Sequence, residues 1–366
     1  MTGRFRRLLD CLCRRYRDRP AGQTIEELTI DERIPAGETA TDIGTDILIV
    51  GAGPVGLYGA YCAGFRGLRT VLVDALPTCG GQITALYPEK QIRDIAAVPG
   101  ARGRDVVDAL KRQADAYDPT YLLGRQAVAL AHSADRRPRV TLSDGTTVEA
   151  GAVILTAGIG AFTPRTLPAG EDFLGRGLTY FVPDPAAHAD QDVIVVGGGD
   201  SAVDWALALY PIARSVTLVH RRGTFRAHAA SVSEVLACGA EIVTGAQVMA
   251  LHGDDRLREA HLRVDGEDEV RVLKADTCIA ALGFISNLGP LAEWGVALER
   301  RAILVDTRMR TTVDGVFAAG DITAYPGKVR LMSVGFGEVA TAVNNAAVAM
   351  DPGLSLFPGH SSEESA

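Results

Sequence analysis

A glycine-rich turn that follows an apolar run occurs twice in this 366-residue chain. The first copy reads "ILIVGAGPVG" (Ile47–Gly56), and the second reads "VIVVGGGDSA" (Val193–Ala202). Each continues through a helix-like stretch into another apolar strand, whose last residue, Asp74 or His220, lies 23 positions after the first glycine of its turn. Equal spacing in two copies predicts two βαβ units, each built to bind a dinucleotide.

The three small residues of each turn have different tasks. The first permits a tight bend, the second lets the backbone approach a pyrophosphate, and the third lets the helix pack against the strand. These positions are Gly51, Gly53 and Gly56 in the first unit, and Gly197, Gly199 and Ala202 in the second. We therefore expect one nucleotide at each turn.

The residue that closes each unit distinguishes the two nucleotides. Asp74 is suited to accept hydrogen bonds from ribose hydroxyls, which favours an unphosphorylated ribose such as that of FAD or NAD. The second unit ends "HRRGTFRAH", in which Arg221, Arg222 and Arg226 could clamp a ribose 2′-phosphate. This favours NADPH, and the alternative is a solvated basic loop at a strand end.

Composition limits the other possibilities. Forty glycines and only 6% aromatic residues suit an α/β fold, and a net charge of −8 gives no reason to expect nucleic acid or an anionic membrane as partner. The six cysteines have neither zinc-site spacing nor the density of a disulfide scaffold, so we expect no metal site and a reducing cytoplasm. Ile47–Phe65 lacks charge, but its five glycines and one proline favour a strand, a turn and a buried helix over a membrane span.

Two further segments stand apart from the repeat. Residues 1–44 begin with an arginine-rich stretch and then turn acidic, which predicts a flexible N-terminal extension. Near the C-terminus, "TTVDGVFAAGD" (Thr311–Asp321) carries an aspartate at the end of an apolar run, beside a glycine that allows close ligand approach.

Several longer phrases carry a family resemblance: "CGGQITALYPEK", "GGGDSAVDWAL", "HRRGTFRAH", "AAGDITAYPGK" and the tail "PGHSS". With them the chain resembles the thioredoxin-reductase-like ferredoxin–NADP reductases, which are flavoproteins with two dinucleotide-binding domains. The resemblance implies an α/β fold of two Rossmann-like domains, with an NADPH-binding domain (164–284) inserted into a discontinuous FAD-binding domain (45–163 and 285–366).

The resemblance also assigns residues to the FAD site. Beyond the first glycine turn and Asp74, the matching FAD-contact positions are Gln82, Tyr87, Val128, Phe162, Asp321 and Ser362. Tyr87 matches an aromatic residue that stacks on one face of the flavin ring. His360 matches a residue that covers the other face from a partner subunit, which implies a homodimer. The chain has Asp74 where glutamate is common in the family, and residues 1–44 have no counterpart there.

Thioredoxin reductase is the nearest enzymatic alternative. That chemistry needs a pair of thiols, in a C-x-x-C motif before the second glycine turn, but Gly177–Val193 contains no cysteine. The resemblance therefore implies electron transfer between NADPH and ferredoxin through FAD, with no obligatory acid or base residue. Flavodoxin or another acceptor, and a non-catalytic flavin-binding sensor, are the alternatives, and the three arginines argue against the sensor.

Overall fold

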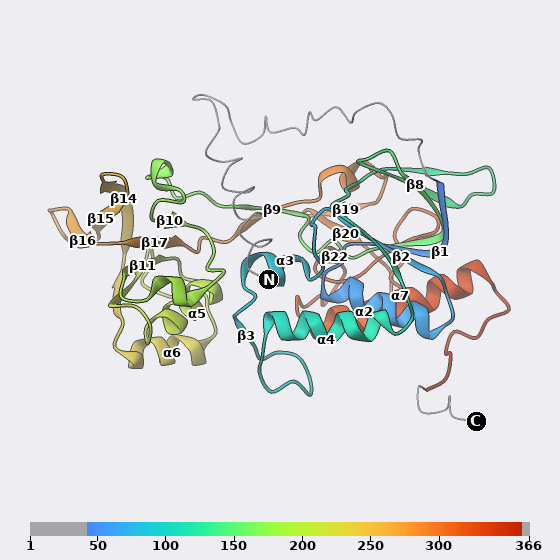
Figure 1. Cartoon of the computed structure of the whole chain (residues 1–366), viewed down its shortest axis with the longest axis horizontal. Helices are drawn as coiled ribbons and strands as arrows, with labels where there is room; N and C mark the ends of the chain where they lie inside the picture. Colours follow the sequence, from blue (N-terminus) through green and yellow to red (C-terminus); the bar gives the residue numbers. More distant parts are fainter. Residues whose placement is uncertain (1–41, 361–366) are drawn as a thin grey trace. The chain divides into compact units, whose positions relative to one another are not determined.

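The computed structural model describes residues 42–360, which form two compact units. One unit, here called the inserted unit, comprises residues 164–285. The other, the discontinuous unit, comprises residues 42–163 and 286–360. The chain passes between them through β9 (Ala161–Pro164) and β18 (Phe284–Asn287), which pair with each other (Figure 1). The expected N-terminal extension, apart from its last three residues, and Ser362 lie outside the described residues.

A seven-stranded sheet forms the framework of the discontinuous unit. Its main path runs β5-β2-β1-β8-β7-β6, and a further strand, β21, pairs with β8. The strands are β1 (Asp42–Val50), β2 (Thr70–Asp74), β5 (Thr120–Leu123), β6 (Ala127–His132), β7 (Pro138–Leu142), β8 (Thr147–Leu155) and β21 (Val316–Ala318). The pairs among β5, β2, β1, β8 and β21 are parallel, while β6 and β7 extend the sheet as an antiparallel meander. Parallel strands buried on both faces read as continuous apolar runs, as "ILIV" does in β1.

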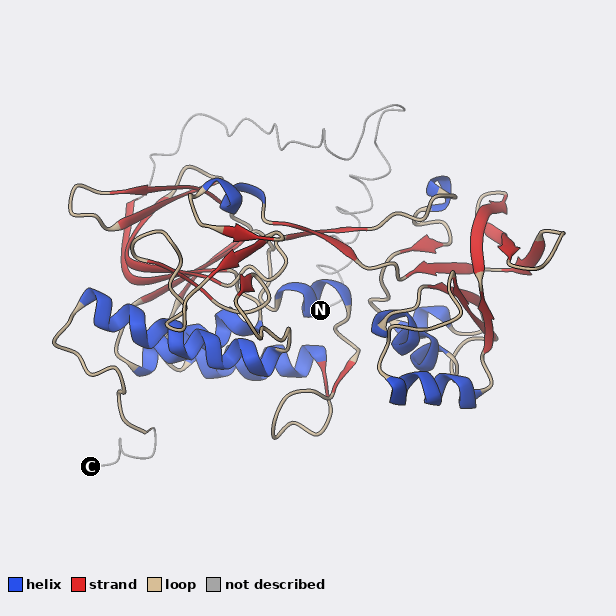
Figure 2. Ribbon diagram, turned by 180° about the vertical axis from the view of Figure 1, so that it is seen from behind, coloured by secondary structure: helices blue, strands red, loops and turns tan. Residues whose placement is uncertain are grey.

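Three helices cover one face of this sheet (Figures 1 and 2). They are α2 (Pro54–Phe65), α4 (Gly103–Asp115) and α7 (Met332–Met350). Small residues let them approach closely: a side chain at Gly59 of α2 would come within 2.7 Å of Val339 of α7. The opposite face packs on a second apolar cluster that includes η4 (Gly289–Glu293).

Shorter elements complete the discontinuous unit, and they are α3 (Gly81–Leu86), β3 (Gln91–Ile92), β4 (Ala101–Arg102), β19 (Leu298–Glu299), β20 (Ala302–Leu304) and β22 (Thr323–Ala324).

The inserted unit repeats this design on a smaller scale. Its parallel sheet runs β10-β17-β11-β12-β13, and a separate antiparallel meander runs β14-β15-β16. The strands are β10 (Leu178–Thr179), β11 (Asp192–Val196), β12 (Ser215–His220), β13 (Glu241–Thr244), β14 (Ala246–Gly253), β15 (Leu257–Val264), β16 (Arg271–Lys274) and β17 (Thr277–Ala280). Its helices are α5 (Asp200–Leu209) and α6 (Ala229–Cys238), and 3-10 turns form η2 (Glu171–Phe173) and η3 (Pro185–His188).

Both predicted βαβ units are present. The strand β1 lies between β2 and β8, and its counterpart β11 lies between β12 and β17. The charge-free stretch Ile47–Phe65 forms the end of β1, a glycine turn and α2, as its glycines and proline predict.

Within residues 42–360, no helix is both long enough and apolar enough to cross a membrane.

Candidate functional site

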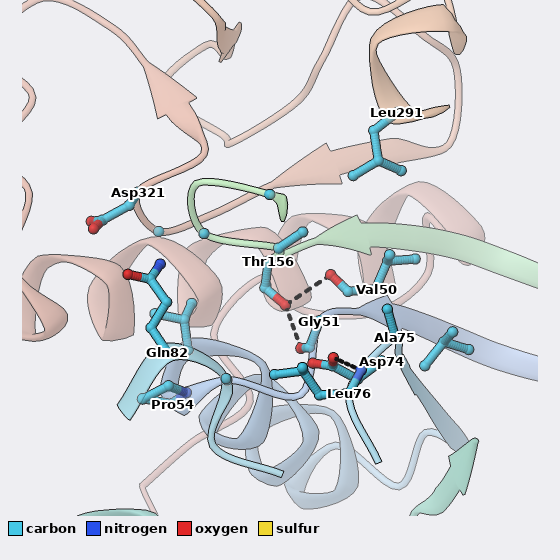
Figure 3. Close-up of a pocket in the computed structure, with 18 of the residues that line it drawn as sticks. Val50, Gly51, Pro54, Asp74, Ala75, Leu76, Gln82, Thr156, Leu291 and Asp321 are labelled. Atoms are coloured by element: carbon cyan, nitrogen blue, oxygen red, sulfur yellow. Dashed lines mark hydrogen bonds between the residues drawn. The ribbon is translucent and has the colours of Figure 1, made fainter. Parts of the chain in front are cut away.

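A cavity of about 410 Å³ opens at the carboxyl end of the parallel strands of the discontinuous unit (Figure 3). Its lining comes from the first glycine turn, the end of β2, the start of α3, the turn after β8, η4 and the start of α7. Ligands bind to open α/β sheets at this edge, and the volume lies within the range of about 300–1,000 Å³ found for small-molecule sites.

The first glycine turn shows why each of its positions is small. A Cβ atom on Gly51 would lie 2.7 Å from the carbonyl group of Thr156, and one on Gly56 would lie 1.8 Å from the carbonyl oxygen of Gly51. Gly53 differs, because a Cβ atom there would meet no protein atom within 4 Å, although Gly53 lines the cavity. The chain therefore needs Gly51 and Gly56 for its own packing, whereas Gly53 leaves room for a ligand.

Two side-chain interactions hold this turn in place. The hydroxyl of Thr156 donates to the carbonyl oxygens of Gly51 (2.8 Å) and Val50 (3.2 Å). The carboxylate of Asp74 accepts from the backbone N–H of Ala52 (2.7 Å) and of Leu76 (2.8 Å). Burial raises the pKa of Asp74, and these two hydrogen bonds oppose the shift. Each carboxylate oxygen accepts more than one hydrogen bond, so Asp74 can still bind a hydroxyl.

Gln82 and Asp321 mark one end of the cavity, away from Leu291 (Figure 3). Tyr87 also lines the cavity, and burial together with the nearby carboxylates of Asp321 and Asp94 raises its pKa to about 12. Tyr87 is therefore a neutral aromatic surface at physiological pH. Burial raises the pKa of Asp321, while Lys328 and Arg330 oppose the shift with their positive charge.

The loop that carries Asp321 is anchored from α7 by a buried charge. The carboxylate of Glu338 accepts from the Gly320 N–H (2.7 Å) and from the Tyr325 hydroxyl (2.5 Å). Lys328 completes the cluster with bonds to Glu338 (2.5 Å) and to the Gly320 carbonyl (2.9 Å), and the Lys328 and Glu338 side chains are only 9% and 4% exposed. Gly320 is thus fixed through both its N–H and its carbonyl group.

Val128 and His360, two further residues assigned to the first site, are not among the described residues that line the cavity. Val128 follows the cavity residue Ala127 on β6, at a point where the pairing of β6 with β7 shifts register. Phe162 is on β9, and its side chain is not described. His360 is exposed, with its ring 4.9 Å from that of Phe357.

The second glycine turn gathers the predicted arginines. The backbone N–H of Arg226 donates to the carbonyl of Gly198 (2.7 Å), and the His220 ring lies where a side chain on Gly198 would have to fit. Burial lowers the pKa of His220, and the positive charges of Arg221, Arg222 and Arg226 lower it further. All three arginine side chains are exposed, so the cationic group lies next to the turn and open to solvent.

This turn repeats the packing of the first. A Cβ atom on Gly197 would lie 2.4 Å from the carbonyl oxygen of Ala281, and Ala202 is fully buried. Gly199 again faces open space, with no protein atom within 4 Å of a Cβ placed there. The second position thus leaves room for a ligand in both units.

Sequence reasoning missed several residues of the first site. Thr156 follows an apolar strand and could have been found as a hydroxyl at the carboxyl end of β8. Leu331 and Met332 line the cavity but belong to no pattern. Glu338 carried one usable signal, since it is the only charged residue of α7.

The cysteines within residues 42–360 do not form a disulfide pair. Among the described residues, all four cysteines are free. Cys62, Cys79 and Cys278 are buried, and burial raises the pKa of Cys79 to about 11 and those of the other two to about 12. Protonated, enclosed thiols are poor nucleophiles, so these positions do not provide disulfide chemistry.

Comparison with known proteins decides the family. The family model described as pyridine nucleotide-disulphide oxidoreductase matches residues 45–351. The chain belongs to this family. Within the pyridine nucleotide-disulphide oxidoreductases, it is 60% identical to the ferredoxin–NADP reductase of Frankia alni, with 87% of this chain and 99% of the relative covered. The ferredoxin–NADP reductase of Thermus thermophilus is 47% identical, with 88% and 98% covered. The resemblance inferred from the sequence is confirmed.

Solved structures support the fold. A thioredoxin reductase of T. acidophilum matches with a TM-score of 0.74 at 23% identity, covering 85% of this chain and 99% of that one. The enzyme of Lactococcus lactis matches with a TM-score of 0.73 at 23% identity, with 84% and 99% covered. These likenesses confirm the predicted α/β fold of two-domain flavoproteins.

Proposed function

We propose that this protein is an FAD-dependent oxidoreductase that transfers electrons between NADPH and ferredoxin. The observation that carries the proposal is the 60% identity to a ferredoxin–NADP reductase over nearly its whole length. The site supports it, since the cavity brings together the first glycine turn, Asp74, Gln82, Tyr87 and Asp321.

The cavity fits FAD by its packing. Gly53 leaves open space where a pyrophosphate would approach, and Pro54 begins α2, so the helix N-terminus points toward that space. We assign Gly51, Gly53, Gly56 and Asp74 to the adenosine diphosphate part of FAD. We assign Gln82, Tyr87 and Asp321 to the flavin half, with Val128, Phe162 and Ser362 as further contacts.

NADPH is assigned to the inserted unit. Arg221, Arg222 and Arg226 would bind the 2′-phosphate, and Gly197, Gly199 and Ala202 would shape the turn under the pyrophosphate. When bound, FAD would supply the exchange of two electrons with NADPH and of single electrons with a carrier, which suits an iron–sulfur protein. The chain itself binds, orients and shields, and no side chain needs to act as an obligatory acid or base.

The test separates this activity from disulfide reduction. We expect the purified protein to reduce ferredoxin with NADPH at an unchanged rate after treatment with N-ethylmaleimide at pH 7, because Cys62, Cys79 and Cys278 are buried and protonated. Mass spectrometry should find these three thiols unmodified in the native protein and modified after unfolding. A rate that falls in step with alkylation of any one of them would contradict the assignment.

A pair of glycine substitutions tests the assignment of the first turn. We expect Gly53→Ala to leave the stability of the apoprotein within about 0.5 kcal/mol of the wild type, because its Cβ meets no protein atom. The same variant should bind FAD at least about tenfold more weakly, because the methyl group enters the space assigned to the pyrophosphate. Gly56→Ala should instead lower stability itself, since its Cβ would lie 1.8 Å from the Gly51 carbonyl oxygen. Denaturant unfolding and fluorescence titration with FAD provide the two readouts, and equal FAD affinity in Gly53→Ala and wild type would contradict the proposal.

We also propose a homodimer in a reducing cytoplasm. His360 is exposed near the end of the described chain, so it is available to cover a flavin in a second copy together with Tyr87 on the other face. Free cysteines at every described position favour a reducing compartment. Light scattering on the purified holoprotein tests the dimer, and a monomer at micromolar concentration would contradict it.

A further inference from the structure

We propose that two neighbouring segments, residues 88–104 and 325–331, form the docking surface for an acidic one-electron carrier protein. This inference rests on the proposed function and adds where the partner binds. The molecule as a whole has a net charge of −8 and repels an acidic partner, so docking requires a local region of opposite character.

Both segments lie at the Asp321 end of the cavity. Tyr87, which immediately precedes the first segment, and Leu331, which ends the second, both line the cavity. The two segments meet where the hydroxyl of Ser333, just after the second, donates to the backbone carbonyl of Asp94 (2.9 Å). Because electron transfer weakens steeply with distance, a carrier has to dock near the flavin half of the site.

The local charge is positive. In residues 88–104 the basic side chains are Lys90, Arg93, Arg102 and Arg104, and the acidic ones are Glu89 and Asp94. Glu89 is already engaged by Arg104 (2.7 Å) and Arg102 (3.5 Å), and Arg104 also pairs with Asp105, just beyond this segment (3.8 Å). In the second segment, Lys328 is neutralised by Glu338, while Arg330 is exposed and its charge reaches Asp321. The excess of cations fits a partner with a patch of carboxylates.

The second segment also exposes apolar side chains on a fixed backbone. Val329 is 52% exposed and Leu331 39% exposed, on either side of Arg330. Hydrogen bonds from Lys328 and Tyr325 to Glu338 of α7 fix the backbone of this loop. The buried centre of an interface is more apolar than its rim and is enriched in arginine, and a preformed backbone reduces the entropy lost on binding. We infer that Val329 and Leu331 contact the partner and that the surrounding cations guide its approach.

Substitutions on the surface test this with two electron acceptors. The variants are Arg93→Glu and Val329→Ser. The control is Arg137→Glu. Ala127, at the start of β6, lines the cavity, and the strand extends about 17 Å away from it before the turn that carries Arg137. NADPH oxidation is measured in the holoprotein with a small uncharged quinone, which needs neither a docking surface nor charge steering, and with an acidic [2Fe–2S] ferredoxin.

We expect Arg93→Glu to raise the KM for ferredoxin about tenfold at low salt and Val329→Ser to raise it severalfold, with the rates of quinone reduction unchanged. In 0.5 M NaCl the deficit of Arg93→Glu should shrink, because screening removes a charge effect, while that of Val329→Ser should persist. The control should match the wild type. A wild-type KM for ferredoxin in both surface variants overturns the docking surface alone. A wild-type protein that reduces the quinone but no ferredoxin overturns both the docking surface and the proposed function.

Discussion

Replacing Lys328 with methionine is expected to destabilise the discontinuous unit by about 3–5 kcal/mol. The substitution leaves the carboxylate of Glu338 buried, with only the Gly320 N–H and the hydroxyls of Tyr325 and Thr323 as partners. Because the same cluster fixes Gly320 beside Asp321, we also expect weaker retention of FAD. Urea unfolding of the apoprotein and the flavin content of the purified protein measure the two effects.

A second substitution identifies the cause. The double variant Lys328→Met/Glu338→Gln leaves no buried charge at these two positions. It should therefore recover most of the unfolding free energy that Lys328→Met loses. FAD retention should recover less, because the lysine bond to the Gly320 carbonyl is still missing. A Lys328→Met variant within about 1 kcal/mol of the wild type would show that the buried pair does not hold this loop.

The second large effect concerns the choice of nicotinamide nucleotide. Replacing both Arg221 and Arg222 with alanine is expected to raise the KM for NADPH at least about 100-fold, since each charged hydrogen bond to a phosphate contributes about 1.5–3 kcal/mol. The KM for NADH should change by less than about twofold, because NADH carries no 2′-phosphate. Steady-state ferricyanide reduction with each nucleotide provides both values.

Arg256 supplies the matched control. It is an exposed arginine of the same unit, in the connection between β14 and β15, and it is not one of the arginines whose charge acts on His220. Arg256→Ala should leave both KM values unchanged. Equal increases for NADPH and NADH in the double variant would mean that the two arginines do not bind the 2′-phosphate.

Much of the framework could be predicted from the sequence because the glycine turns are local patterns. Gly51 has a positive φ of 114°, and a side chain on Gly56 would meet the Gly51 carbonyl five residues earlier, so both requirements arise within ten residues of chain. The apolar runs on either side predict the parallel strands. The arginines after β12 were also predictable as a group, since they follow directly on the strand that ends beside the second turn.

The remainder depends on contacts between distant segments. Asp74 was expected to bind a ribose, but the spacing could not show that its carboxylate also holds the Ala52 N–H. Glu338 stands out in an apolar helix, yet no pattern indicates that it reaches Gly320 and Lys328. Such pairs are set by how α7 packs against the sheet and its loops, which is tertiary information that a single sequence does not carry.

The most direct test of the central claim is anaerobic reduction of ferredoxin by NADPH, followed by absorbance, with catalytic amounts of the purified holoprotein. We predict rapid and complete reduction with NADPH and a much slower reaction with the same concentration of NADH. Flavin reduction by NADPH without any transfer of electrons to ferredoxin would contradict the proposed reaction.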